Sequence, residues 1–177
     1  PDALLEFQTQ VLSDRTVHGL INNAGVFIRN PLDAWSEKVD EQHWRLNTMV
    51  PLNLIQSFTP SLREASGTIV NLVDNVSSTK PWPNHAGYAA SKAGLLAITR
   101  SLAVELAPHI RVNAVGPGLI LNSKEDFPEW HHLCQKIPMK RWGTPKEVAD
   151  TVVFLLLGPA YITGQVLYVD GGWRLDP

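Results

Sequence analysis

Stretches with helical spacing of apolar residues alternate along this chain with short apolar runs. In the first stretch, Leu4, Phe7, Val11 and Leu12 fall on one side of a helix. We predict helices over residues 2–12, 41–58, 87–106 and 145–157, and strands over residues 17–21, 68–73, 110–115 and 165–169. This alternation is typical of a parallel sheet covered by helices on both faces, so we predict one α/β domain, residues 1–177.

Two helices contain informative polar or proline positions. Thr144-Pro145-Lys146-Glu147 predicts a helix start, with Thr144 as the N-cap, Pro145 in the first turn and Glu147 three residues after the cap. Pro51 lies inside the helix predicted over residues 41–58, four residues after Asn47. Since proline has no N–H, the Asn47 carbonyl loses its helical partner, and we expect a bend there and a water on the freed carbonyl.

The segment from Leu119 to Met139 has weak periodicity and several polar residues. A long stretch of this kind inside a compact domain is typical of a functional excursion, and we predict a substrate lid.

Composition excludes several classes of function. The chain has 177 residues, is 44% hydrophobic and 18% charged, and carries a formal net charge of -2, which gives no basic surface for nucleic acid. Its longest apolar run, Val152 to Leu157, is too short to span a bilayer, and from these residues we expect no signal peptide. The single cysteine, Cys134, cannot form an internal disulfide, so we expect a cytoplasmic setting. His131-His132 lacks partners at metal-ligand spacing, and we predict no metal site.

Small and polar residues follow three of the predicted strands. They are Asn22-Asn23-Ala24-Gly25, Asp74 and Pro117-Gly118. Any one of them alone is typical of a turn. Since ligands bind beyond the carboxyl ends of parallel strands, the three together predict a crevice that a flat cofactor can approach closely.

Tyr88-Ala-Ala-Ser-Lys92 opens the helix predicted over residues 87–106. Residues four apart lie on one helical face, so the Lys92 ammonium is expected beside the Tyr88 phenol. A tyrosine pKa is normally about 10, and a fixed cation lowers it by favouring the phenolate. We therefore expect Tyr88 to exchange a proton with a substrate near neutral pH.

These residues occur in an order that resembles the short-chain dehydrogenase/reductase family. The matching pieces are Asn22-Asn23-Ala24-Gly25, Asn47, Tyr88-x-x-x-Lys92, Asn113-x-Val115-x-Pro117-Gly118, Tyr161-Ile162-Thr163-Gly164 and Val169-Asp170-Gly171-Gly172. The resemblance implies a nicotinamide-dependent oxidoreductase on a Rossmann-type, doubly wound, three-layer sheet. It implies Tyr88 as proton donor, Lys92 on the nicotinamide ribose and Asn47 in a water relay. It also implies cofactor contacts from Asn23, Ala24, Gly25, Tyr88, Lys92, Pro117, Gly118 and Leu119, and a homotetramer built on the two long helices.

Asp74 departs from the common family pattern, which has a serine at this strand end. Strand register places Asp74 in that position, whereas counting back from Tyr88 selects Asn75; Ser77 and Ser78 are expected out on the loop. We prefer strand register because insertions accumulate in loops. A carboxylate can accept hydrogen bonds from an amino-pyrimidine ring or, when protonated, deliver a proton to a ring nitrogen. An Asp at this place also fits a simple turn.

Within the family, this Asp resembles the pattern of pteridine and dihydromonapterin reductases. Phe27 matches a phenylalanine that stacks the pterin in that subgroup, and such stacking suits a flat heteroaromatic ring. Substrate contacts are therefore expected from Phe27, Asp74 and Tyr88.

The glycine-rich cofactor turn of the family is absent from these residues. We expect the sequence to be part of a longer chain that supplies the N-terminal strands, and the 177 residues alone to bind cofactor poorly. The resemblance to pteridine reductases favours NADP(H), with NAD(H) not excluded.

Three functions remain open from the sequence. The first is an NADPH-dependent pteridine reductase, in which Tyr88, Lys92, Asp74 and Asn47 handle protons. The second is a reductase of a 3-oxoacyl, sugar or steroid ketone, and the third is a non-catalytic binding scaffold.

Overall fold

The structure, a computed structural model, describes residues 2–13, 15–74, 82–120 and 133–175. Four parallel strands form one sheet: β1 (Gly19–Asn22), β2 (Thr68–Leu72), β3 (Arg111–Pro117) and β4 (Val166–Val169). They lie in the order β1-β2-β3-β4, with Asn22 paired to Asn71 and Asn71 to Ala114. The predicted α/β class and parallel sheet are confirmed.

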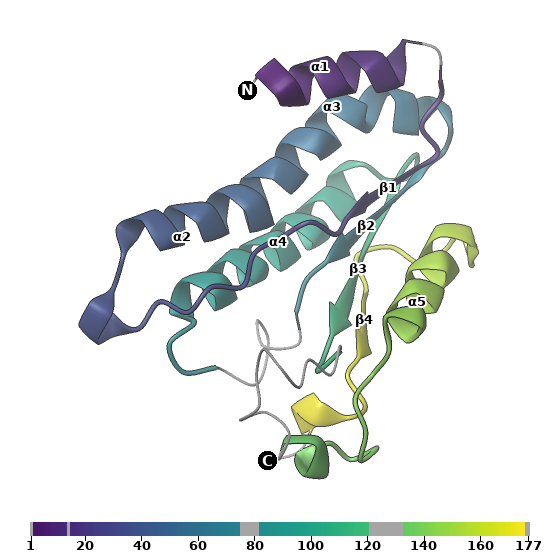
Figure 1. Ribbon diagram of the computed structural model, residues 1–177. Coiled ribbons are helices and arrows are strands. Elements are labelled where there is room, and N and C mark those ends of the chain that lie inside the picture. The colour runs from purple at the N-terminus through teal and green to yellow at the C-terminus, as the bar shows by residue number, and fades with distance from the viewer. Residues whose placement is uncertain (1, 14, 75–81, 121–132, 176–177) are drawn as a thin grey trace.

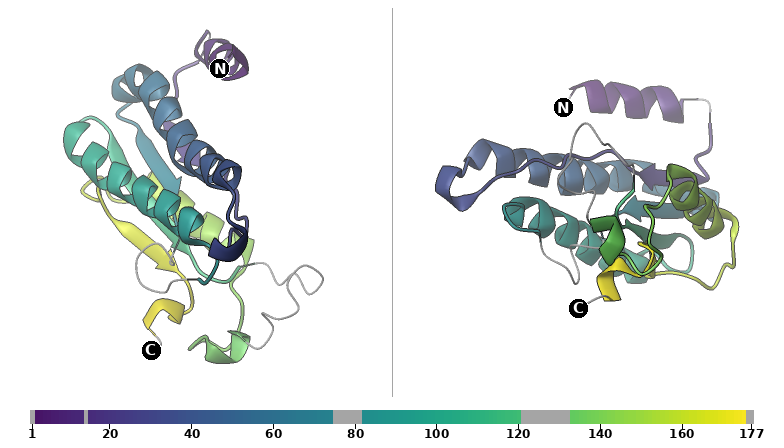
Figure 2. Two further views of the ribbon diagram at one scale, coloured as in Figure 1. Left: turned by 90° about the vertical axis from the view of Figure 1, so that its left-hand side faces the viewer. Right: turned by 60° about the horizontal axis from the view of Figure 1, so that its bottom comes forward.

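Helices cover both faces of this sheet (Figure 1). α3 (Val50–Glu64) and α4 (Ala86–Glu105) pack on one face, and α5 (Pro145–Leu157) packs on the other. The two views in Figure 2 show the same layers from the side and from below. Alternation within β2 serves both cores, since Ile69 packs beneath α3 and α4 and Val70 packs beneath α5.

The helix predicted over residues 41–58 is longer than expected and changes type in its middle. It begins as α2 (Glu37–Trp44), passes through the π-helical turn η2 (Arg45–Met49) and continues as α3 to Glu64. The Val50 N–H donates to the Arg45 carbonyl, five residues back, just before Pro51. Pro51 has no N–H to donate, and the helical hydrogen bonds change to the π pattern just before it. The irregularity therefore lies where the sequence predicted a bend, and it takes the form of a π turn.

The remaining elements follow the predicted pattern with small shifts at their ends. α1 (Asp2–Leu12) lies along the end of α3, as Figure 1 shows. β1 begins two residues later than predicted and includes Asn22. At the start of α5, the Thr144 side chain accepts from the Glu147 N–H and the Glu147 carboxylate accepts from the Thr144 N–H, so the predicted capping box is confirmed.

Short helical turns complete the described chain. η1 (Leu32–Ala34) precedes α2, and η4 (Trp173–Leu175) follows β4. Most of the predicted lid, residues 121–132, lies outside the described residues, whereas Leu133 and Ile137 are buried against Trp173. No helix among the described residues is long and apolar enough to span a bilayer.

Candidate active site

A groove opens at the carboxyl ends of the strands, where the three strand-end signals meet. It has a volume of about 550 Å³, a size typical of small-molecule sites. Its wall includes Asn23 after β1, Asp74 after β2, and Pro117 and Gly118 at the end of β3. Apolar side chains of α5 form the opposite wall, namely Val148, Val152, Val153 and Leu156. Tyr88 and Lys92 also line the groove.

Tyr88 lies at the first turn of α4 and is almost completely buried. Its hydroxyl donates a hydrogen bond to Oδ2 of Asp74. The structure thus brings Asp74 to the phenol, as strand register indicated, while Asn75, Ser77 and Ser78 lie outside the described residues.

The pKa of Tyr88 is raised above its ordinary value, which corrects the expectation from the Tyr–Lys spacing. Burial disfavours the phenolate most, and the charge of Asp74 and its hydrogen bond add to the effect. Lys92 is buried too, and its Nζ donates to the Leu72 carbonyl at 2.7 Å. Burial lowers the pKa of Lys92, and Asp74 opposes that shift. In this state Tyr88 therefore keeps its proton.

Asn47 lies in the π turn η2 and is fully buried. Its Oδ1 accepts from the Val26 N–H at 2.8 Å, and its Nδ2 donates to the Val26 carbonyl and to Ser91 Oγ, both at 3.0 Å. Ser91 in turn donates to the Tyr88 carbonyl at 2.7 Å. The Asn47 side chain therefore ties the segment after β1 to the helix that presents Tyr88.

Gly25 lies between the side chains of Asn47 and Lys92. A Cβ at this position would come within 2.8 Å of Asn47 Oδ1 and 3.5 Å of Lys92 Nζ. The backbone of Gly25 thus approaches both side chains as closely as a residue without a side chain permits. Such a tight polar rim beside a large groove fits a nicotinamide cofactor, with Asn23 on the groove wall and Ala24 exposed next to it.

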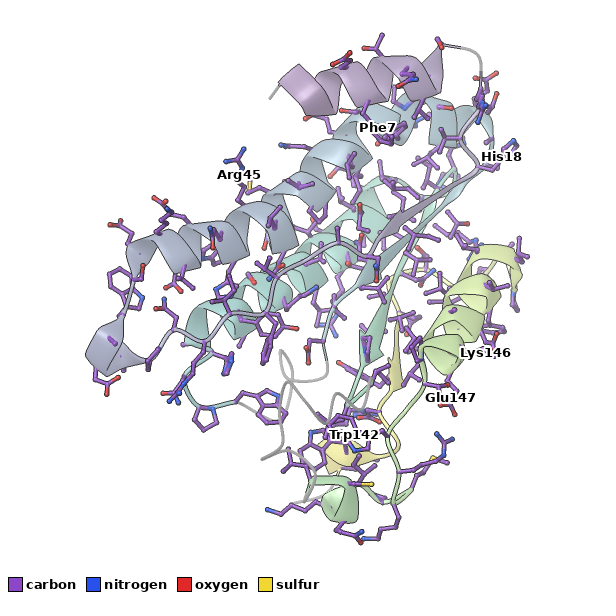
Figure 3. The ribbon with its side chains drawn as sticks, in the orientation of Figure 1. Phe7, His18, Arg45, Trp142, Lys146 and Glu147 are labelled. Atoms are coloured by element: carbon purple, nitrogen blue, oxygen red, sulfur yellow. The ribbon has the colours of Figure 1, made fainter. Side chains whose placement is uncertain are left out.

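A second, smaller cavity adjoins the groove at Asp74 and Tyr88. Its volume is about 130 Å³, and its described wall holds Phe27, Asp74, Trp82, Tyr88, Gly118, Leu119, Ile120 and Trp142. Leu119, expected on the cofactor side, lines this cavity instead. Figure 3 places Trp142 at the same end of the sheet as the C-terminal turn η4. Asp74, Tyr88, Gly118 and Ile120 line both spaces.

Phe27 forms part of an aromatic cluster around Tyr88. Its ring stacks on His85, with centroids 4.3 Å apart and planes 3° from parallel, and meets the Tyr88 ring edge-on at 4.6 Å. Phe27 therefore lines the same cavity as Asp74 and Tyr88, and its contact with a substrate stays a prediction. Sequence reasoning missed Trp82, Trp142, His85 and His43; the first two lie in irregular segments, where no periodicity marks them.

Three-residue clusters of His, Cys, Asp or Glu that could hold a metal ion are absent from the described residues. His131 and His132 lie outside them.

Comparisons with known proteins agree with this geometry. The family model described as "Enoyl-(Acyl carrier protein) reductase" matches residues 5–174. The chain is 36% identical to protein FixR of Bradyrhizobium diazoefficiens over 99% of its own length and 66% of FixR. It is 38% identical to the 3-oxoacyl-[acyl-carrier-protein] reductase FabG of Staphylococcus epidermidis, over 97% of its own length and 72% of FabG.

Solved structures show the same fold. FolM, alternative dihydrofolate reductase 1 of Brucella canis, complexed with NADP, superposes with a TM-score of 0.86 and 32% identity, over 97% of this chain and 69% of FolM. The chain thus spans about two thirds of the length of these relatives. The parallel sheet, the groove at its carboxyl edge and these similarities together indicate a nicotinamide-dependent oxidoreductase. The chain belongs to the short-chain dehydrogenase/reductase family.

Proposed function

We propose that the intact protein is an NADPH-dependent reductase of a dihydropterin-type ring. The observation that supports this most is the hydrogen bond from Tyr88 to the Asp74 carboxylate, at the junction of groove and cavity. When bound, the nicotinamide cofactor supplies the hydride. The reduction consumes that hydride and one proton, and it leaves the cofactor oxidised.

The proton belongs to Tyr88 in this proposal. A buried phenol whose pKa is raised keeps its proton until a stronger base lies against it, which suits a donor. A ring nitrogen that gains negative charge on reduction is such a base. Loss of the proton leaves a Tyr88 phenolate. In the proposal, the ammonium of Lys92, which donates to the Leu72 carbonyl, supplies the positive charge that stabilises this phenolate.

Asp74 selects the substrate. An ionised carboxylate accepts hydrogen bonds from the amino group and ring N–H of a pterin. The same charge would repel the alkoxide that develops when a ketone is reduced. The aromatic walls at Phe27, Trp82 and Trp142 suit a flat heteroaromatic ring that stacks on its faces. The FolM structure, a dihydrofolate reductase by name, is one of the folds that match.

A second candidate is reduction of a 3-oxoacyl thioester, favoured by the 38% identity to FabG. It uses the same Tyr88 and Lys92, so the two candidates differ at Asp74 and in the small cavity. The small cavity has a volume of only about 130 Å³, so a long acyl chain would have to extend out of it past Trp82 and Trp142.

Assembly as a homotetramer through the long helices is a further part of the proposal, and its basis is the family resemblance. Large apolar side chains are exposed on α2, at Trp44, and on the following turn η2, at Leu46 and Met49. Exposed apolar residues that recur on one element favour a partner surface. Light scattering of the intact protein is expected to give four times the mass of one chain.

The test of function is NADPH oxidation by the intact protein with dihydrobiopterin, dihydromonapterin, dihydrofolate and a 3-oxoacyl thioester in parallel. The proposal predicts the highest kcat/KM with a dihydropterin. A preference for the thioester would establish the second candidate. No oxidation with any of them, by protein shown to be folded, would favour the non-catalytic scaffold.

A further inference from the structure

Two side chains of the α2–η2 rod hold the segment that follows β1. His43 and Asn47 are four residues apart, so they lie on one helical face about 5–6 Å from each other. Asn47 Oδ1 accepts from the Val26 N–H at 2.8 Å, and His43 Nε2 accepts from the Ile28 N–H at 3.2 Å. Phe27 lies between these two anchored amides.

The bond to Ile28 fixes the protonation state of His43. A nitrogen that accepts from a backbone N–H cannot carry a proton, so His43 is neutral with its proton on Nδ1. The ring is fully buried, and within the described part of the chain its Nδ1 has no hydrogen-bond partner. Asp40 Oδ1 lies 3.8 Å from that nitrogen.

Asp40 connects this histidine to the start of α4. Its carboxylate accepts from Asn30 Nδ2 at 2.8 Å and from Trp35 Nε1 at 2.9 Å. A Cβ at Gly87 would lie 2.1 Å from Asp40 Oδ1, so the carboxylate sits directly against the backbone next to Tyr88. The His43 ring itself meets the Tyr88 ring edge-on, with centroids 5.9 Å apart.

We propose that His43 is a positioning residue: in its neutral form it fixes the Phe27 segment against Tyr88, and its protonation releases that segment. The inference rests on the proposed role of Tyr88 as donor and holds for a pterin or a ketone substrate. A protonated Nε2 would face the Ile28 N–H, donor against donor. The Ile28 amide would then be left unsatisfied, and Phe27 would lose one of its two anchors.

The groups that face His43 bear on where this release occurs. Among the described residues, they are Asp40 on its own helix, and His85 and Tyr88 from the beginning of α4. Burial lowers the pKa of His43 most; Asp40 opposes this, and the charge of His85 adds to it. Release is therefore expected below the ordinary histidine range, and activity is expected to fall there.

Two variants distinguish the hydrogen bond that His43 accepts from the space that its ring fills. His43→Gln keeps an acceptor for the Ile28 N–H and cannot titrate, whereas His43→Phe keeps a ring and has no acceptor. We expect His43→Gln to retain most of kcat/KM at neutral and alkaline pH and to lose the acid limb assigned to His43. We expect His43→Phe to lower kcat/KM about 10- to 100-fold at all pH values, because the Phe27 segment shifts. His18→Gln is the control and is expected to behave as wild type. Figure 3 places His18 at the end of the sheet away from Trp142 and the cavity that it lines.

A readout that needs no turnover accompanies the kinetics. In the NMR spectrum of the intact protein, the Ile28 amide is expected to titrate together with the His43 ring, and to stay constant in His43→Gln. The inference is overturned by an Ile28 amide that ignores His43, or by an acid limb that is unchanged in His43→Gln. Failure of pterin turnover alone contradicts the proposed function instead, since the amide titration is independent of substrate.

Discussion

The Tyr88 hydroxyl donates to the Asp74 carboxylate, and the two side chains stand where the large groove meets the aromatic cavity. Fourteen positions separate them in the sequence. Tyr88 lies in the first turn of α4, and Asp74 lies two residues after the end of β2. The buried Tyr88 hydroxyl keeps its proton beside this carboxylate. In the proposed function, the Asp74 carboxylate also accepts hydrogen bonds from N–H groups of the substrate.

Tyr88→Phe removes the proposed proton donor and leaves the ring in place. We expect turnover of the preferred substrate to fall about 10²- to 10⁴-fold, the usual contribution of a positioned acid. Steady-state NADPH oxidation measures this, with the fully exposed Tyr161→Phe as the control. Retention of more than a tenth of wild-type kcat would exclude Tyr88 as the donor.

Asp74→Asn removes the charge that opposes the Tyr88 phenolate and keeps the shape of the side chain. Burial raises the pKa of Tyr88 most and the charge of Asp74 adds to it, so the variant loses the part that the charge contributes. The phenolate is then expected to form at lower pH than in wild type. Titration of ¹³C-labelled tyrosine by NMR follows this directly, and an equal or higher pKa in the variant would contradict the assigned cause.

Much of the fold was predictable from the sequence because local patterns determine it. The period of apolar residues places all four strands and the long helices, and four residues from Thr144 to Glu147 specify the start of α5. The start of α2 was missed. Ser36 makes no side-chain cap bond within the described chain, and contacts of Asp40 with Asn30 and Trp35 hold this end.

The site was less predictable because its details depend on distant contacts. The Tyr–Lys spacing indicates that Lys92 lies near Tyr88, but it does not show that Lys92 donates to the Leu72 carbonyl while Asp74 takes the phenol. The direction of the Tyr88 pKa shift follows first from burial and then from the charge and hydrogen bond of Asp74. Trp82 and Trp142 meet at the cavity only through folding, 60 positions apart in irregular segments.

Pro51→Ala supplies an N–H where the π turn ends. That amide can donate to the Asn47 carbonyl and convert the turn to an ordinary α-helix, which removes the place expected for a relay water. We expect kcat to fall about 10- to 100-fold with thermal stability unchanged or higher. Pro60→Ala, in the same helix and away from the groove, is the matched control. Equal effects of the two substitutions would refute a special role of Pro51.

Glu147 gives the fold an acid-sensitive helix start. Hydrogen bonds from Arg141 first, and then from Thr144, lower the pKa of Glu147 to about 2 from the ordinary value of 4.5. A lowered pKa means that the stabilisation is complete above 4.5 and is lost as the pH falls towards 2.

The melting temperature of wild type is therefore expected to exceed that of Glu147→Gln near neutral pH, and the two are expected to converge in that acidic window. Asp150→Asn, which removes a carboxylate paired with Lys146 on the same helix, controls for the loss of one charge. Figure 3 shows Lys146 and Glu147 together at the start of α5. A difference that persists at the lowest pH would show that Glu147 acts through packing instead.

The central claim is that the carboxylate beside the phenol makes this a reductase of pterins. The most direct measurement is the ratio of kcat/KM for a dihydropterin to kcat/KM for a 3-oxoacyl thioester, in wild type and in Asp74→Ser. A ratio above one in wild type that falls about tenfold or more in Asp74→Ser, the effect of roughly one lost charge-assisted hydrogen bond, is the predicted result. Equal losses on both substrates, or a wild-type ratio below one, would contradict the account.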